Sequence, residues 1–161
     1  MKNKSVQFLT QAAMIAAIYV VLTMLANALG LASYAIQIRF SEALTILPYF
    51  TFAAVPGVTI GCLIANILAG GALLDIIFGT FASLLGALGT YYLRKKSKWL
   101  APVPPIVANA IIVPPVLYFA YGITPVWFSF ITVSIGEVIC CGIMGMALLF
   151  ALLKYRKIFE A

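Results

Sequence analysis

The sequence contains no histidine and very little negative charge. Its 161 residues include four Asp and Glu residues against ten Lys and Arg residues, which gives a formal net charge of +6. Charged residues make up 9% of the chain and hydrophobic residues 65%, whereas globular proteins carry about 25% and about 45–50%. A soluble domain of this size needs more surface charge, but a lipid bilayer requires apolar surface. The composition therefore excludes an ordinary soluble domain and predicts an integral membrane protein.

The sequence lacks the residues that several kinds of catalytic and metal-binding sites require. Without histidine, Cys62, Cys140 and Cys141 have no partner for a Cys/His nucleophile or a mixed metal site, and their apolar surroundings favour packing roles. Neither a Gly-x4-Gly-Lys-Ser/Thr phosphate loop nor a Gly-x-Ser-x-Gly motif occurs. We therefore expect no catalytic residue, no metal and no cofactor in this chain. A transporter built from it would need a gradient or an energy-supplying partner.

The basic residues are grouped at the ends of apolar stretches. Lys2 and Lys4 open the chain, one cluster lies within residues 94–98 and another within residues 154–157, while Arg39 stands apart. Short loops rich in Lys and Arg mark the cytoplasmic side of membrane proteins, so we predict that both termini are cytoplasmic. Basic clusters that flank apolar spans set topology or touch anionic lipid. We therefore expect the lipid bilayer, and no nucleic acid, as a partner.

The apolar sequence divides into six stretches. A membrane-spanning helix takes about 20 residues. Glycine and proline residues near positions 30, 56, 70 and 122, together with the basic run at residues 94–98, separate the stretches. We predict an all-α membrane protein, a single domain over residues 1–161, folded as a compact bundle of six transmembrane helices. The predicted spans are residues 6–29, 36–55, 57–70, 73–93, 100–121 and 127–153. The outer loops, where function is expected, are residues 30–38, 70–73 and 121–126.

Small residues at four-residue spacing recur in the first, third and fourth stretches, and such spacing lets helix backbones approach closely in lipid. In the third and fourth stretches we expect them to pack inside the bundle. Ala12, Ala13, Ala16 and Ala17 form two overlapping Ala-x3-Ala pairs in the first stretch, close to the basic N-terminus. There, internal packing and contact with an external partner are equally compatible with the sequence.

Three acidic residues lie in or beside the apolar stretches, although a charge at the centre of a spanning helix costs about 2.5–3.5 kcal/mol. Glu42 follows Arg39 by three residues, so mutual neutralisation and ligand contact are both open. Asp75 suits either a helix N-terminus or a ligand contact. Glu137 has no basic residue on its own stretch. We expect it to meet a ligand cation, an amidine-like N–H pair or a neighbouring amide such as Asn109.

Amides and aromatic rings accompany these acids. Arg39, Glu42, Thr45 and Tyr49 recur at helical spacing and predict one polar face. Aromatic walls with a few convergent amides and carboxylates suit a planar, hydrogen-bonding heterocycle, although an interfacial aromatic belt has a similar composition. The candidate substrate-binding residues are Glu137, Asn109, Asp75, Glu42, Arg39, Asn66 and Tyr49.

Three segments of the chain are similar to one known family. They are QIRFSEALTILPYF at residues 37–50, GCLIAN at 61–66 and LDIIFG at 74–79. They resemble the QueT family, and the last two stretches match it in hydropathy and in Asn109 and Glu137. Members of that family are substrate-binding (S) components of energy-coupling factor (ECF) importers in bacteria and archaea, assigned to precursors of the tRNA nucleoside queuosine.

This resemblance implies a six-helix subunit in a prokaryotic plasma membrane that captures queuine or an aminomethyl-deazaguanine outside and delivers it inward. The implied partners are a transmembrane coupling protein and two cytoplasmic ATPases, which would use the ATP. Two other hypotheses stay open. One is an S component for another planar, vitamin-like nutrient, and the other is a small proton-coupled or structural membrane subunit that has no ATPase partner.

The resemblance also implies roles for individual residues. Ala12 with Ala16, or Ala13 with Ala17, matches the surface of the first helix that contacts the coupling protein. In the site, Glu137 would accept hydrogen bonds from the guanine-like N–H edge, and Asn109 would fix the ring. Asp75 or Glu42 would meet a substrate ammonium group.

Overall fold

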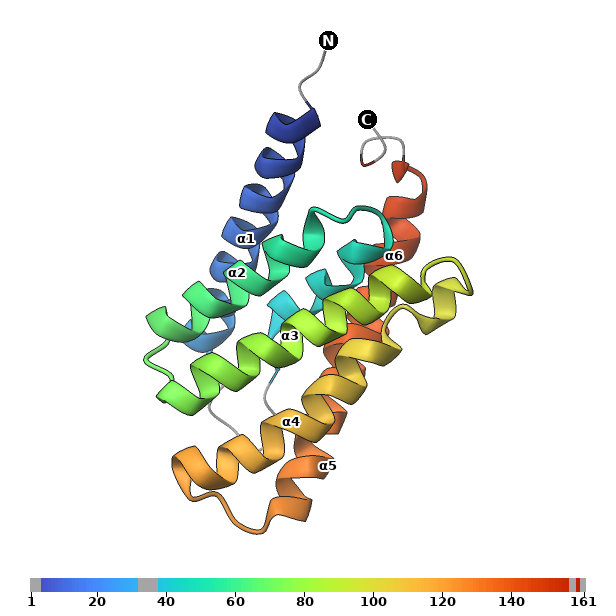
Figure 1. Cartoon of the computed structure of the whole chain (residues 1–161). Helices are drawn as coiled ribbons and strands as arrows, with labels where there is room; N and C mark the ends of the chain where they lie inside the picture. The colour runs from blue at the N-terminus through green and yellow to red at the C-terminus, as the bar shows by residue number, and fades with distance from the viewer. Residues whose placement is uncertain (1–3, 32–37, 157–158, 160–161) are drawn as a thin grey trace.

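The chain folds into a bundle of helices (Figure 1). A computed structural model describes residues 4–31, 38–156 and 159, and in these ranges all regular secondary structure is helical. Most of the predicted outer segment 30–38 lies outside the described residues. In chain order the elements are α1 (Lys4–Ala28), the 3₁₀ helix η1 (Phe40–Tyr49), α2 (Ala54–Leu68), α3 (Leu73–Leu93), the short 3₁₀ helix η2 (Lys98–Leu100), α4 (Val103–Tyr121), α5 (Val126–Glu137), the π-helical segment η3 (Val138–Met144) and α6 (Gly145–Leu153).

Four helical segments of the described chain are long and apolar enough to cross a membrane. They are α1, α3, η2 with α4, and the continuous segment from α5 to α6. Helix α2 is apolar but has 15 residues, which is about 22 Å at 1.5 Å per residue, against a hydrocarbon core of about 30 Å. The chain is therefore a multi-pass membrane protein. Helix α1 begins and α6 ends at the same end of the bundle (Figure 1).

The predicted second span, residues 36–55, is wrong as one spanning helix. In its place lies η1, whose ten residues cover about 20 Å at about 2 Å per residue. All residues from Ser41 to Pro48 are buried, so η1 is an internal segment that other helices surround. The three-residue spacing of Arg39, Glu42 and Thr45 fits this geometry, because residues i and i+3 eclipse one another in a 3₁₀ helix.

Helices α1 and α2 meet through small residues. A Cβ atom on Gly57 would lie 2.9 Å from the Ala12 carbonyl oxygen, and one on Gly61 would lie 3.0 Å from the Ala16 carbonyl oxygen. Ala12 and Ala16 are accordingly buried in this contact. Ala13 and Ala17 are exposed on another face of α1. The two overlapping alanine pairs therefore have different surroundings, one inside the bundle and one outside it.

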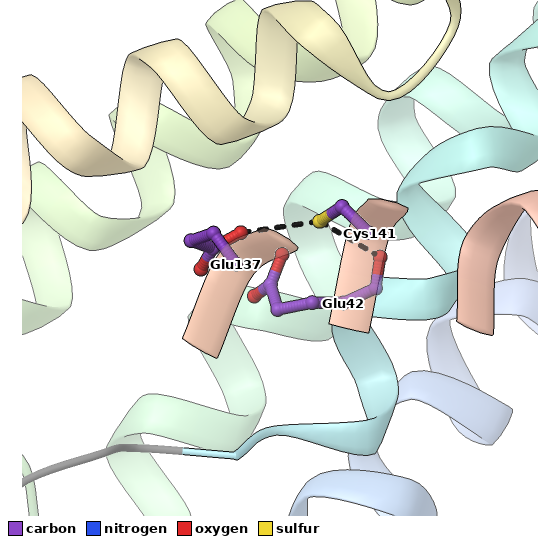
Figure 2. A group of neighbouring side chains, drawn as sticks. All are labelled: Glu42, Glu137 and Cys141. Atoms are coloured by element: carbon purple, nitrogen blue, oxygen red, sulfur yellow. Dashed lines mark hydrogen bonds between the residues drawn. The ribbon is translucent and has the colours of Figure 1, made fainter. Parts of the chain in front are cut away.

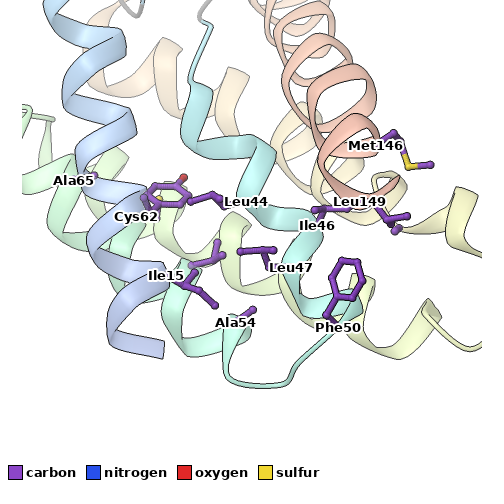
Figure 3. Packing of buried hydrophobic residues seen from close by; sticks show 13 residues of the cluster. Ile15, Leu44, Ile46, Leu47, Phe50, Ala54, Cys62, Ala65, Met146 and Leu149 are labelled. Carbon is purple, nitrogen blue, oxygen red and sulfur yellow. The ribbon is translucent and has the colours of Figure 1, made fainter. Parts of the chain in front are cut away.

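Buried apolar side chains from several elements gather around η1 (Figure 3). Leu44, Ile46 and Leu47 of η1 pack in one cluster with Ile15 of α1 and Leu149 of α6. Because helices contact η1 from several sides, the polar residues at its beginning are held inside the bundle and away from lipid. This placement positions the candidate site.

Candidate functional site

Polar side chains that are far apart in the sequence line one small cavity, which we call the inner chamber. Its volume is about 20 Å³, room for about one water molecule. It is lined by Arg39, Glu42, Cys62, Asp75, Gly79, Ser83, Asn109, Val113, Val133 and Glu137.

Helical periodicity explains why these residues converge. Residues four positions apart lie on one face of an α-helix. Helix α3 provides Asp75, Gly79 and Ser83 at this spacing, and α5 provides Val133 and Glu137. Each helix therefore presents one short row of residues with at least one polar side chain to the chamber, and η1 contributes Glu42.

Glu42 is the most enclosed acid of the site, with 3% of its surface exposed. The phenol of Tyr19 donates a hydrogen bond to its Oε1 atom at 2.5 Å. Its Oε2 atom is buried and has no hydrogen-bond partner among the described residues. Because an unsatisfied buried oxygen is costly and rare, this atom marks a position where a ligand donor would be favourable.

Glu137 lies beside Glu42, and Cys141, one turn after Glu137, contacts both residues (Figure 2). The Cys141 Sγ atom lies 3.1 Å from Glu137 Oε2 and 3.4 Å from the Glu42 carbonyl oxygen. One ligand atom from each of these three side chains lies within 4.8 Å of the other two. At that spacing they can share one cationic group. A metal ion also fits the spacing.

A second cavity, which we call the vestibule, adjoins the chamber and has a volume of about 450 Å³. This size falls within the range of about 300–1,000 Å³ that is typical of small-molecule sites. Arg39 and Asp75 line both cavities, so they form the boundary between them. The vestibule is lined by Asn27, Arg39, Asn66, Ala69, Gly70, Gly71, Asp75, Leu117, Tyr121 and Ile123.

Hydrogen bonds tie this boundary to the surrounding helices. The Arg39 guanidinium donates to Asn66 Oδ1 at 3.4 Å. The Tyr121 hydroxyl donates to Asp75 Oδ2 at 3.4 Å and accepts a hydrogen bond from the Ala72 backbone N–H at 2.9 Å. Asp75 thus occupies the first turn of α3, as one alternative predicted, and also lines the chamber, while its contact with a ligand stays a prediction.

The predicted pairing of Arg39 with Glu42 is not the main contact of either residue. Both line the chamber, but the guanidinium donates its hydrogen bond to Asn66, and the Glu42 carboxylate accepts one from Tyr19. Two different helices therefore hold the two charges in place, and the carboxylate retains one oxygen without a partner.

The structure brings together most of the predicted site residues. Glu137, Asn109, Asp75, Glu42 and Arg39 line the chamber, and Asn66 lines the vestibule next to Arg39 and Asp75. Tyr49 does not join them. It lies in a separate groove near Arg94, at the other end of α3.

The predicted aromatic walls are not at the chamber. Its lining contains no aromatic residue among those described, and Phe78, Phe81, Tyr118, Trp127 and Phe128 are all more than 40% exposed. These rings face outward, as those of an interfacial belt would.

Sequence reasoning missed several polar contributors. Tyr19, Cys141 and Tyr121 each contact a site carboxylate, and Ser83 lines the chamber. Tyr19 carried a usable signal, because a tyrosine in the middle of an apolar helix needs a partner for its hydroxyl. For Cys141 no such signal exists, since a buried thiol is ordinary in an apolar span.

Comparison with known proteins gives one family. The sequence profile described as QueT transporter matches residues 9–154. The Queuosine precursor transporter QueT of Lactococcus lactis subsp. cremoris (strain MG1363) is 34% identical over 85 residues. That alignment covers 53% of this chain and 50% of the relative, so the chain matches about half the length of that protein. No solved structure gives a significant match.

Proposed function

This chain belongs to the QueT transporter family, and from that premise we propose that it binds a queuosine precursor from outside the cell and delivers it inward. The matched relative is named as a queuosine precursor transporter. The observation that carries the proposal is the pair of neighbouring carboxylates, Glu42 and Glu137, of which Glu42 has a buried oxygen without a partner.

The chemistry of a deazaguanine base complements this pair. Its ring N–H and exocyclic amine are adjacent donors, which a carboxylate accepts as a bidentate pair. Glu137 takes that edge, and the Asn109 amide donates to the ring carbonyl. The Oε2 atom of Glu42 accepts a hydrogen bond from the ammonium group that the aminomethyl base and queuine carry. Such a charge-assisted hydrogen bond is stronger than one between neutral groups.

The sizes of the two cavities suggest the order in which the base occupies them. The inner chamber, at about 20 Å³, is too small for a bicyclic base, whereas the vestibule, at about 450 Å³, has sufficient volume. The base first occupies the vestibule. It reaches the two glutamates after Arg39 and Asp75, which line both cavities, move apart.

Energy for transport comes from other chains in this proposal, since the sequence has no phosphate loop. The chain acts as an S component of an ECF importer in a prokaryotic plasma membrane. A transmembrane coupling protein binds the exposed Ala13 and Ala17 face of α1, and two cytoplasmic ATPases hydrolyse ATP. Close helix approach requires such a face of small residues, which supports this choice over the buried pair Ala12 and Ala16.

Calorimetric titration of the purified chain tests the proposal. We expect saturable binding of queuine and the aminomethyl base, and weaker binding of both by the Glu137→Gln variant. Binding of a pterin or a vitamin in place of both bases would assign another nutrient. Absence of heat and of thermal stabilisation with every compound would contradict a substrate-capturing role.

A further inference from the structure

A third cavity, which we call the basic groove, lies at the far end of α3 from the vestibule. Asp75 in the first turn of α3 lines the vestibule, and Tyr91 near its last turn lines the groove. The 21 residues of α3 span about 31 Å, close to the thickness of the hydrocarbon core. The groove therefore lies at the opposite membrane surface. It has a volume of about 590 Å³ and is lined by Tyr49, Phe50, Thr51, Phe52, Tyr91, Arg94, Lys95, Arg156 and Phe159.

The charges that line the groove have one sign. Arg94, Lys95 and Arg156 come from the end of α3 and from the segment after α6, and no acidic residue is among the described residues of the lining. The Arg94 guanidinium lies 3.9 Å above the centre of the Tyr91 ring, which orients it at the groove wall. This lining is complementary to an anion.

An apolar surface leads out of the same groove. The Phe52 ring packs edge-on against Tyr91, with centroids 4.9 Å apart, and stacks with Phe8 of α1 at 6.3 Å. Phe52 and Phe8 are each at least 40% exposed, so their rings extend the groove along the outside of α1. An acyl chain can pack against such an apolar surface, whereas a free anion gains no favourable contact from it.

We propose that the basic groove binds an anionic phospholipid, with its phosphate between Arg94 and Lys95 and an acyl chain along Phe52 and Phe8. The groove lies at the end of a helix of spanning length, which is where lipid phosphates are. Its aromatic residues suit the membrane interface, and Arg94 and Lys95 supply two positive charges for a headgroup phosphate. This site is separate from the substrate site and does not depend on the function proposed above.

Native mass spectrometry of the purified chain in detergent tests this site. The probes are phosphatidylglycerol and phosphatidylcholine with matched acyl chains, together with glycerol 3-phosphate and inorganic phosphate. We expect phosphatidylglycerol to stay bound to the wild type about tenfold more strongly than phosphatidylcholine. The double variant Arg94→Gln/Lys95→Gln should lose this preference. The control Lys98→Gln should keep it, because Lys98 lies outside the groove, near the Trp99 and Phe150 rings.

Three outcomes overturn the proposal. Equal retention of the two lipids by the wild type removes the site, and this comparison decides the matter even if the double variant does not fold. Unchanged preference in a folded double variant places the lipid elsewhere. Binding of inorganic phosphate as tight as that of phosphatidylglycerol assigns a free-anion site. A Phe52→Ser variant that weakens retention of phosphatidylglycerol but not of glycerol 3-phosphate supports the acyl-chain contact.

Discussion

The Tyr19 hydroxyl donates a hydrogen bond to the Glu42 carboxylate, and this contact links α1 directly to the candidate site. A second bond, from Thr23 to the Ser41 hydroxyl, joins the same two elements one turn later. On another face of α1, Ala13 and Ala17 are exposed. One helix thus carries both a support for a site carboxylate and the surface proposed for partner contact.

Replacing Tyr19 with Phe should weaken binding of the aminomethyl base about tenfold. The variant keeps the buried ring but removes the only hydrogen bond that the Glu42 carboxylate accepts among the described residues, and such bonds to charged groups are worth about 1.5–3 kcal/mol. Calorimetry measures the change. Tyr92→Phe is the control, because Tyr92 is 71% exposed. Equal affinities of Tyr19→Phe and the wild type would contradict a positioning role for Tyr19.

The two glutamates should differ in what they recognise. Glu42→Gln should lower the affinity for the aminomethyl base about 10- to 100-fold and leave that for guanine, which has no ammonium group, nearly unchanged. Glu137→Gln should lower both, because both bases present the same N–H edge. Titration of each variant with each base gives four comparisons. A parallel loss for both bases in Glu42→Gln would remove the assigned contact with the ammonium group.

Gly86→Ala should destabilise the fold by about 1–3 kcal/mol. A Cβ atom there would lie 2.7 Å from the Cα atom of Pro105, so the α3 and α4 backbones would have to separate. Gly142→Ala is the matched control, since its Cβ would meet Val138 at an ordinary 3.7 Å. Thermal unfolding in detergent should show a lower midpoint for Gly86→Ala alone. Similar midpoints for the two variants would mean that α3 and α4 pack more loosely than described.

Tryptophan at Ala13 should impair partner binding, whereas tryptophan at Ala12 should impair folding. Ala13→Trp projects from an exposed face, so the chain should fold and bind substrate but fail to co-purify with the coupling protein. Ala12→Trp places a large ring in the contact with Gly57 and should destabilise the chain itself. Size-exclusion chromatography with and without the coupling protein separates the two effects. Retention of the partner by Ala13→Trp would exclude this face as the docking surface.

Helices with a continuous apolar pattern were predictable from local signals. The stretch predicted at residues 73–93 is α3, because Gly70 and Gly71 interrupt the chain before it and basic residues follow it. The resemblance to the QueT family, which rested on short polar segments, is confirmed by the profile match over residues 9–154. The number of helices that cross the membrane and their orientation depend on how the chain lies in the lipid bilayer, so both stay predictions.

The segment around η1 was not predictable in the same way. Its sequence is as apolar as that of a spanning helix, but its side chains are buried by surrounding helices instead of by lipid. Burial in protein and burial in lipid both require apolar residues, so the sequence does not distinguish them. Because of this ambiguity, Tyr49 was wrongly predicted to lie with the other site residues. It follows Glu42 by seven residues, which in a 3₁₀ helix is about 14 Å, so it lies well beyond the chamber. Convergence of the acids was predictable because an acid in an apolar stretch needs a partner.

An inner chamber with room for about one water molecule makes any measured substrate affinity a composite quantity. In the proposed function, a base reaches the two glutamates only in conformations in which the chamber has widened. The apparent dissociation constant would then equal the intrinsic one divided by the population of those conformations. Substitutions far from the glutamates that favour the wide form should tighten binding without adding a contact. Selection for affinity in this protein can therefore act on helix packing as well as on the residues that touch the base.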